Sequence, residues 1–319
     1  MSGGTNRRGP DRATLLAFAI VVLVGGSNAI AVRFMVHDMP ALWSAAIRFG
    51  AAGLILLAIT AASRRKLPRG KSLVGALAYG AFGFAASYGL LYTALRDVPA
   101  STAMVMLALN PLFTFGLAIA HRQEHFRPLG LAGGMIAATG IAIVFSDQLK
   151  AAVPLVPLLL VVVAAVAMSE SAVIVKLIPR SDPFATNSVA MLAGGGLLLI
   201  ASVVAGEPFA LPASGASWLA LGYLVALGSI VLFTAYVYAI SRWTASAMSY
   251  TTLLMPLVTI SLGAVLFSEP VTVSFLVGGA ITLAGVYVGS FVGRTLRAPI
   301  STPTPECMPV PAPAAAGRY

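Results

Sequence analysis

Long runs of apolar residues, separated by short polar stretches, fill the sequence from about residue 12 to residue 294. A helix needs about 20 mostly apolar residues to cross a bilayer core of about 30 Å. Helices are expected because backbone groups in lipid must pair within their own segment, whereas a closed barrel would show short alternating strands. The pattern therefore predicts an all-α integral membrane protein with ten transmembrane helices, near residues 12 to 36, 41 to 63, 71 to 95, 98 to 120, 127 to 146, 154 to 177, 184 to 205, 214 to 241, 244 to 267 and 272 to 294.

The ten predicted helices form two matching sets of five. A shift of 143 residues places Pro40 on Pro183 and Gly53 on Gly196. A shift of 145 residues places Pro111 on Pro256, Glu124 on Glu269, and Gly133, Gly134 and Gly140 on Gly278, Gly279 and Gly285. Because five is odd, the second set must cross the membrane in the opposite sense. The duplication is thus an inverted repeat, with which many transporters build alternating gates around one central site.

The repeat also predicts the domain boundaries. Residues 12–146 form the first five-helix unit, residues 147–153 a linker, and residues 154–296 the second unit. Residues 1–11 are Gly-rich and polar, and residues 297–319 are rich in Pro and Ala. Such compositions do not form a packed core, so we expect disordered tails.

Composition and charge support a membrane protein and predict its orientation. The chain is 59% hydrophobic and 9% charged, with a mean hydropathy of +0.93, whereas soluble domains carry about 25% charged residues. With a cytoplasmic N-terminus, 16 loop and tail Lys or Arg residues lie inside and only Arg96 and Lys150 lie outside. This positive-inside pattern predicts that both termini are cytoplasmic. The same distribution of Lys and Arg accounts for the net charge of +10. We therefore do not expect nucleic-acid binding.

The sequence shows no constellation for catalysis, metal or nucleotide binding. His37, His121 and His125 are all predicted in loops, so we expect no metal cluster and no His-based acid/base pair within the membrane. Gly70-Lys71-Ser72 ends like a P-loop, but Arg65 stands where the first glycine is required. An intramembrane enzyme is therefore a remote alternative. We expect no cofactor and no metal; the expected partners are a small-molecule substrate and the lipid bilayer.

Oligomeric state stays open between a monomer and a homodimer. Gly285, Gly289 and Gly293 recur at intervals of four and leave one helix face without side chains. A neighbouring helix can approach such a face closely, either within the chain or in a dimer.

Polar and aromatic residues at membrane depth are the candidates for a substrate cavity. Tyr88 and Tyr92 are four residues apart and share a predicted helix face, as do Met106 and Asn110. Tyrosine and methionine suit a site for flat or bulky organic solutes; singly, such residues can instead glue helices together or mark the membrane interface. The proposed substrate-binding set is Asn28, Tyr88, Tyr92, Met106, Asn110, Tyr236, Ser249 and Thr252.

Glu170 is the acidic residue that lies clearly inside a predicted helix. A carboxylate at membrane depth is a functional candidate because it is costly in hydrocarbon. We assign it a coupling or gating role, with pairing to a nearby basic residue as the structural alternative.

Each half has a proline in its fourth helix, a glutamate at the end of that helix and a Gly-rich fifth helix: Pro111, Glu124, Gly133, Gly134 and Gly140, then Pro256, Glu269, Pro270, Gly278, Gly279 and Gly285. On these residues the chain resembles the EamA family of the drug/metabolite transporter superfamily, over roughly residues 12 to 294. The first half departs from the second by having His125 where the second has Pro270.

The resemblance implies a bacterial inner-membrane exporter that works by alternating access. Within the family the chain is most similar to bacterial aromatic amino acid exporters, so aromatic or other large neutral amino acids are the first substrate hypothesis. Export of cationic drugs or of nucleotide or sugar-type metabolites is the alternative, and a channel is a further class. The inverted duplication favours a carrier over a channel.

Overall fold

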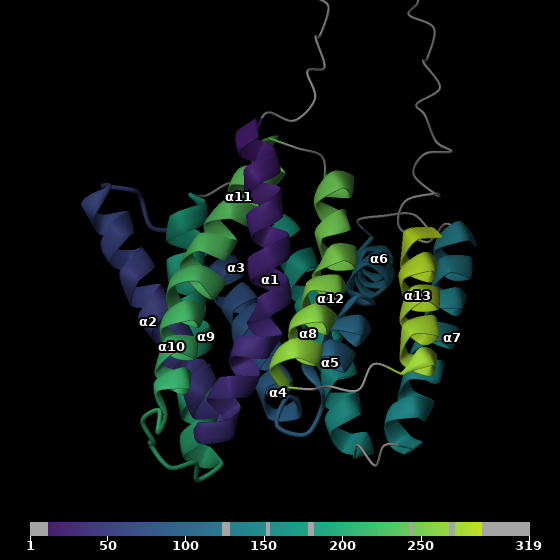
Figure 1. The fold of residues 1–319 in the computed structure, drawn as a ribbon. Helices are drawn as coiled ribbons and strands as arrows, with labels where there is room; N and C mark the ends of the chain where they lie inside the picture. Colours follow the sequence, from purple (N-terminus) through teal and green to yellow (C-terminus); the bar gives the residue numbers. More distant parts are fainter. Residues whose placement is uncertain are drawn as a thin grey trace, which may run out of the picture.

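The computed structural model describes residues 12–122, 128–150, 154–177, 182–242, 245–267 and 272–288. These residues form helices joined by short connections (Figure 1). The elements are α1 (Arg12–Asp38), α2 (Ala41–Ala62), α3 (Lys71–Tyr79), η1 (Gly80–Ala86), α4 (Ser87–Ala94), α5 (Ala100–Leu107), α6 (Asn110–Ala120), α7 (Pro128–Lys150), α8 (Leu155–Leu177), α9 (Pro183–Val204), α10 (Gly215–Val225), η2 (Ala226–Val231), α11 (Leu232–Arg242), α12 (Ala245–Phe267) and α13 (Val273–Tyr287).

The predicted membrane-spanning helices are confirmed. Within the described residues, seven helices are long and apolar enough to cross a bilayer, and three shorter apolar helices cover Pro128–Val144, Leu254–Leu266 and Val273–Gly285. Together they correspond to the ten predicted segments. One boundary differs: α7 continues to Lys150, into the predicted linker 147–153, because a helix can extend past the hydrophobic segment that anchors it.

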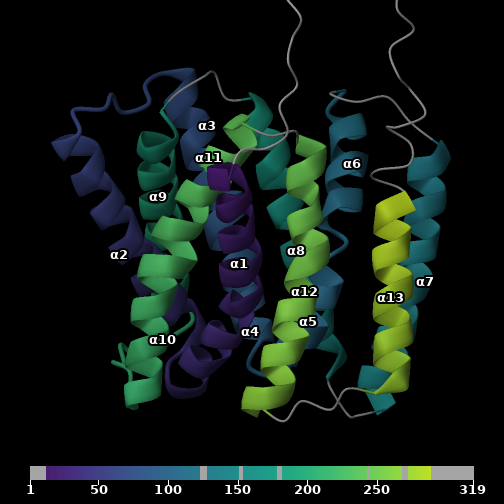
Figure 2. The ribbon, with the colours of Figure 1, turned by 45° about the horizontal axis from the view of Figure 1, so that its top comes forward.

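Corresponding helices of the two halves pack against each other. The second helices, α2 and α9, form one close pair, and the fifth helices, α7 and α13, form another. In both ribbon views α7 and α13 lie together at one edge of the bundle, and α2 lies toward the opposite edge (Figures 1 and 2). The interface between the halves therefore runs through the molecule, and residues buried there belong to both repeats.

Gly285 of the last helix takes part in this packing. A Cβ at Gly285 would lie 2.7 Å from the Gly133 carbonyl oxygen, and one at Gly140 would lie 2.5 Å from the Gly278 carbonyl oxygen. Backbone this close leaves no room for a side chain. Gly285 is thus used within one chain, while Gly289 and Gly293 lie outside the described residues.

The third helix of each half contains a π-helical segment. The segments η1 and η2 begin at Gly80 and Ala226, which are equivalent positions in the repeat to within one residue. A π-helix widens the helix by one residue per turn and is frequent at functional sites. Irregular backbone thus occurs at equivalent points of the third helix in both halves.

The fourth helix of the first half is not continuous. It is broken at Ala108 and Leu109, and α6 starts at Asn110 with a proline in its first turn. Proline lacks an N–H and disfavours a helical residue before it. Met106 and Asn110 lie on either side of this two-residue turn, and their shared face stays a prediction.

Several sequence predictions fall outside the described residues. They concern the tails 1–11 and 297–319, the turn residues Glu124 and Glu269, and His125 and Pro270.

Candidate substrate site

Arg48 occupies the centre of the interface between the two halves. It lies in α2, seven residues after the helix begins, or about 10 Å along its axis at 1.5 Å per residue, and its exposed fraction is 0%. A guanidinium at this depth is costly unless it is paired or hydrogen-bonded. Its surroundings therefore decide what this part of the protein can bind.

Three hydrogen bonds hold the guanidinium. Arg48 Nη2 donates to the Gly228 carbonyl oxygen at 2.8 Å, Nε donates to Ser229 Oγ at 3.0 Å, and Nη1 donates to the Tyr92 hydroxyl at 3.0 Å. Gly228 and Ser229 belong to η2 of the second half, whereas Arg48 and Tyr92 belong to the first. The bonds therefore join the two repeats.

Aromatic rings complete the surroundings of the charge. The guanidinium carbon lies 4.8 Å from the ring centre of Phe49 and 5.3 Å from that of Tyr88. Tyr88 in turn lies 6.5 Å from Tyr92. Cation–π contacts of this kind stabilise a cation by about 0.5–2 kcal/mol each. All these partners are neutral, and no carboxylate in the described part of the chain forms an ion pair with Arg48.

Asn28 of α1 borders the same point. Its Nδ2 donates weakly to the Gly228 carbonyl oxygen at 3.4 Å. Its Oδ1 is buried and has no hydrogen-bond partner among the described residues. Both side chains approach Gly228, since a Cβ there would collide with Asn28 Oδ1 and would lie 3.3 Å from Arg48 Nη2. We call Asn28, Arg48, Tyr88, Tyr92, Gly228 and Ser229 the Arg48 cluster.

Asn110 belongs to a second polar group, between α6 and α8. Its Nδ2 lies 3.0 Å from Met168 Sδ, and its carbonyl oxygen accepts a 3.0 Å hydrogen bond from Ser169. Its buried Oδ1 has no partner within the described residues.

The remaining predicted binding residues lie elsewhere. Met106 is 1% exposed in the core part of α5, and Tyr236 is 40% exposed on α11. Ser249 and Thr252 lie in α12, but their side chains are not among those the structure describes. The structure thus brings together Asn28, Tyr88 and Tyr92, and no hydrogen bond of the Arg48 cluster involves Met106 or Tyr236.

Glu170 pairs with a histidine. Its Oε1 lies 3.0 Å from His121 Nε2, with side-chain exposures of 19% and 38%. His121 directly follows α6, and Glu170 lies in α8. His121 lies in the turn after α6, outside the helices, as the sequence predicted, and the fold brings this turn against α8. The contact ties these two helices together.

The chain closes one end of the bundle with several bonds between the halves. We call this the distal end, where α1 ends and α2 begins. Glu207, in the loop after α9, accepts hydrogen bonds from the backbone N–H groups of Leu42 at 3.2 Å and Trp43 at 2.8 Å. Trp43 Nε1 donates to the Ala210 carbonyl oxygen at 2.7 Å. The loop thereby caps the start of α2.

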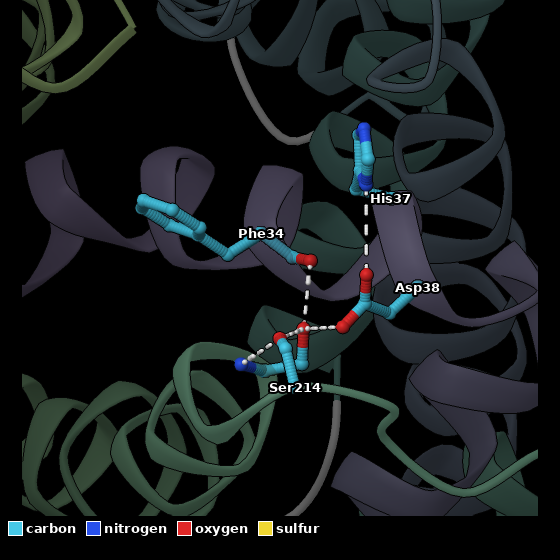
Figure 3. Close-up of polar contacts among 5 residues, drawn as sticks. Phe34, His37, Asp38 and Ser214 are labelled. Carbon is cyan, nitrogen blue, oxygen red and sulfur yellow. Dashed lines mark hydrogen bonds and ion pairs between the residues drawn. The ribbon is translucent and has the colours of Figure 1, made fainter.

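A second distal contact joins α1 to α10 (Figure 3). Ser217 Oγ lies 2.7 Å from Asp38 Oδ2 and 3.1 Å from the Phe34 carbonyl oxygen, and Ser214 caps the start of α10. His37 Nδ1 lies 3.5 Å from Asp38 Oδ1. The structure is therefore closed over the Arg48 cluster at the distal end.

The opposite, proximal end is held differently. Arg65 Nη1 lies 2.8 Å from Asp182 Oδ2, and the guanidinium stacks 4.4 Å from the ring centre of Phe184. A narrow crevice opens beside this contact, lined by Leu56, Pro183, Phe184, Asn187, Phe233 and Thr234. Phe233 contacts Phe84 at 5.3 Å between ring centres, and Phe84 stacks on Tyr88 at 6.3 Å. Aromatic rings thus separate the crevice from the Arg48 cluster.

Sequence reasoning missed Arg48, Gly228 and Ser229. The signal for Arg48 was present, because a charge seven residues inside an apolar helix is a functional candidate. Gly228 and Ser229 carried no such signal. Their role depends on a backbone carbonyl and on a π-helix that brings it to α2.

Comparison with known proteins identifies a family. A model described as the EamA-like transporter family matches residues 12–146 and again residues 155–291. The chain is 29% identical over 276 residues to the uncharacterized inner membrane transporter YedA of Escherichia coli, covering 85% of this chain and 89% of that protein.

Two further relatives have names that mention amino acids. The chain is 29% identical over 250 residues to a probable terminal-alkyne amino-acid exporter of Streptantibioticus cattleyicolor, covering 75% of this chain and 83% of the relative. It is 26% identical over 302 residues to a probable amino-acid metabolite efflux pump of Escherichia coli, covering 88% and 95%. A solved crystal structure shares the fold, with a TM-score of 0.64 at 18% identity over 91% of this chain and all of that one.

Proposed function

Because this chain belongs to the EamA-like transporter family, we propose that it exports aromatic and other large neutral amino acids across a bacterial inner membrane by alternating access. The family match makes it a multi-pass membrane transporter and not an enzyme. The substrate, the direction of transport and the orientation are our proposal.

The observation that carries the proposal is the buried Arg48 with only neutral partners. A fixed positive charge at the interface of the halves repels a cationic drug and attracts a carboxylate. The rings of Phe49, Tyr88 and Tyr92 lie against or near it. A charge that binds a carboxylate and an aromatic surface that binds an apolar side chain together suit a large neutral amino acid.

The relatives named as amino-acid exporters support the same substrate class. The inverted repeat supports alternating access, because each half supplies one gate. We propose that the distal end faces the periplasm, as the positive-inside pattern predicts. In this state the periplasmic gate is closed by Glu207 and Asp38, and the proximal crevice faces the cytoplasm.

We further propose that Glu170 acts in gating. Its contact with His121 holds α6 against α8 at the proximal end, so opening of that end would have to break or move it. A coupling role would add proton uptake by this pair; it predicts that an imposed pH gradient accelerates efflux and that Glu170→Gln removes the acceleration.

Transport by purified protein in liposomes tests the proposal. Vesicles are preloaded with radiolabelled phenylalanine, tryptophan, leucine or glutamate, and efflux is followed with and without unlabelled competitor outside. We expect saturable efflux and counterflow of the aromatic and large neutral substrates, strongly reduced in Arg48→Met and Tyr88→Ala. Arg69→Met is the matched control, because it removes a cation from the exposed loop between α2 and α3.

Two outcomes would contradict the proposal. Amino-acid flux no greater than in empty liposomes, from protein that is monodisperse and folded, removes the amino-acid assignment. Efflux of a cationic dye that increases in Arg48→Met would instead identify the arginine as a barrier to a cationic substrate.

A further inference from the structure

We propose that Arg48 and Asn28 form a two-point site for the α-amino and α-carboxylate groups of the substrate. The guanidinium of Arg48 binds the carboxylate, and Asn28 Oδ1 accepts a hydrogen bond from the ammonium group. This inference rests on the proposed function and names the residues that distinguish an α-amino acid from a simple acid or a simple amine.

The carboxylate half of the site follows from the charge and the donors of Arg48. A guanidinium has five N–H donors, and three hydrogen bonds to neutral acceptors hold it here. The charge has no carboxylate partner in the described residues. A buried charge without a counter-charge costs several kcal/mol, so a substrate carboxylate that reaches the remaining donors gains both hydrogen bonds and neutralisation.

The ammonium half follows from the unsatisfied oxygen of Asn28. A buried acceptor without a donor costs about 1–3 kcal/mol, and such groups in folded proteins call for an explanation. Asn28 Oδ1 is one of these groups, while its Nδ2 is already directed at the Gly228 carbonyl oxygen. An ammonium group brings three donors and no acceptor, which is the complement this oxygen lacks.

Arg48 and Asn28 approach the same glycine. A Cβ at residue 228 would collide with Asn28 Oδ1 and would lie 3.3 Å from Arg48 Nη2. An α-amino acid carries its ammonium and carboxylate on one carbon, so two partners that lie beside one glycine suit both groups. Gly228 contributes by having no side chain between them.

The surrounding rings set the preference for the third substituent. Phe49 and Tyr88 flank the guanidinium and pack edge-on at 4.8 Å between ring centres. Offset and edge-to-face contacts with a substrate ring would extend this arrangement.

Binding measurements that combine three ligands with variants of the two residues test the site. Binding to purified protein is measured for phenylalanine, for 3-phenylpropionate, which lacks the ammonium, and for phenethylamine, which lacks the carboxylate. We expect wild-type protein to bind phenylalanine about 10-fold or more tightly than either analogue, since a hydrogen bond to a charged group contributes about 1.5–3 kcal/mol and 1.4 kcal/mol is tenfold.

The variants assign each ligand group to its residue. In Asn28→Leu the preference for phenylalanine over 3-phenylpropionate should fall to about 2-fold or less, while the preference over phenethylamine persists. In Arg48→Met the pattern should be reversed, and Arg48→Lys should restore part of the preference over phenethylamine. Thr60→Val, which removes a buried and unpartnered hydroxyl farther along α2, should change neither preference.

The outcomes separate this inference from the proposed function. Amino-acid transport with equal binding of phenylalanine and 3-phenylpropionate by wild-type protein overturns the two-point site alone, and this comparison requires no variant to fold. A wild-type preference that survives Asn28→Leu also overturns the ammonium assignment. Absence of both binding and amino-acid flux overturns the proposed function together with the site.

Discussion

Replacing Glu207 by glutamine should open the distal end of the transporter more often. The carboxylate of Glu207 accepts hydrogen bonds from the N–H groups of Leu42 and Trp43 and from Ser202 Oγ at 2.8 Å. The bonds from Leu42 and Trp43 connect the loop after α9 to the first turn of α2, so we expect them to break when the two halves separate at this end. A glutamine of the same shape keeps one acceptor oxygen and turns an NH₂ group toward an N–H.

The expected shift can be worked out from these contacts. Losing one backbone hydrogen bond to a charged acceptor removes about 1.5 kcal/mol. Losing the negative charge at a helix N-terminus removes a further 0.3–1 kcal/mol or so. The closed state should therefore be weakened by about 2 kcal/mol, which corresponds to roughly a 30-fold change in the closed-to-open ratio.

Accessibility of a single cysteine measures this ratio. Cys307 is the only cysteine of the chain, so Ser44→Cys in a Cys307→Ser background gives one reporter. Ser44 is 0% exposed in the first turns of α2, and its labelling by an impermeant maleimide requires opening of the distal end. When opening is fast relative to labelling, the rate follows the open population.

We expect Glu207→Gln to raise this labelling rate by about 20- to 70-fold, the range that a weakening of about 1.8–2.5 kcal/mol sets. Asp97→Asn is the matched control, because it neutralises an exposed acid in the loop between α4 and α5 and should leave the rate unchanged. A rate in Glu207→Gln equal to that of the control would refute the assignment of Glu207 as a closing contact.

Three further predictions concern the rest of the fold. Gly285→Ala should lower stability by about 1–3 kcal/mol through overpacking against backbone, whereas Gly134→Ala, with open space at its Cβ position, should not; equal melting temperatures would contradict the proposed packing. Asp182→Ala should destabilise by about 1 kcal/mol through loss of the α9 cap, while Asp182→Asn, which can still cap and loses only an exposed ion pair, should melt close to wild type. Glu170→Gln and His121→Gln should have similar effects on thermal stability, and the double variant should add little to either; additive effects would show that the two side chains act independently.

The sequence determined the fold class because lipid restricts the choice of structure. An apolar run of about 20 residues can satisfy its backbone in a bilayer only as a helix. For this reason all ten predicted segments are helical in the structure. The duplication could be seen in the sequence because prolines and glycines recur at shifts of 143 and 145 residues.

The sequence was less informative about contacts between helices. The contact between His121 and Glu170 depends on where α6 ends relative to α8, which a linear pattern does not contain.

The candidate site was decided by tertiary structure. The sequence analysis named Asn28, Tyr88 and Tyr92 as polar and aromatic residues at membrane depth, and it missed Arg48, although this charge lies within an apolar helix. Only the packing of the two halves showed that they meet around the Gly228 carbonyl oxygen, because that acceptor belongs to the backbone of η2 and has no residue type to mark it. In a bilayer each apolar segment must pair its own backbone, so the sequence alone predicts the helices. The site depends on which buried donors and acceptors lack partners after all the helices have packed, and only the tertiary structure shows this.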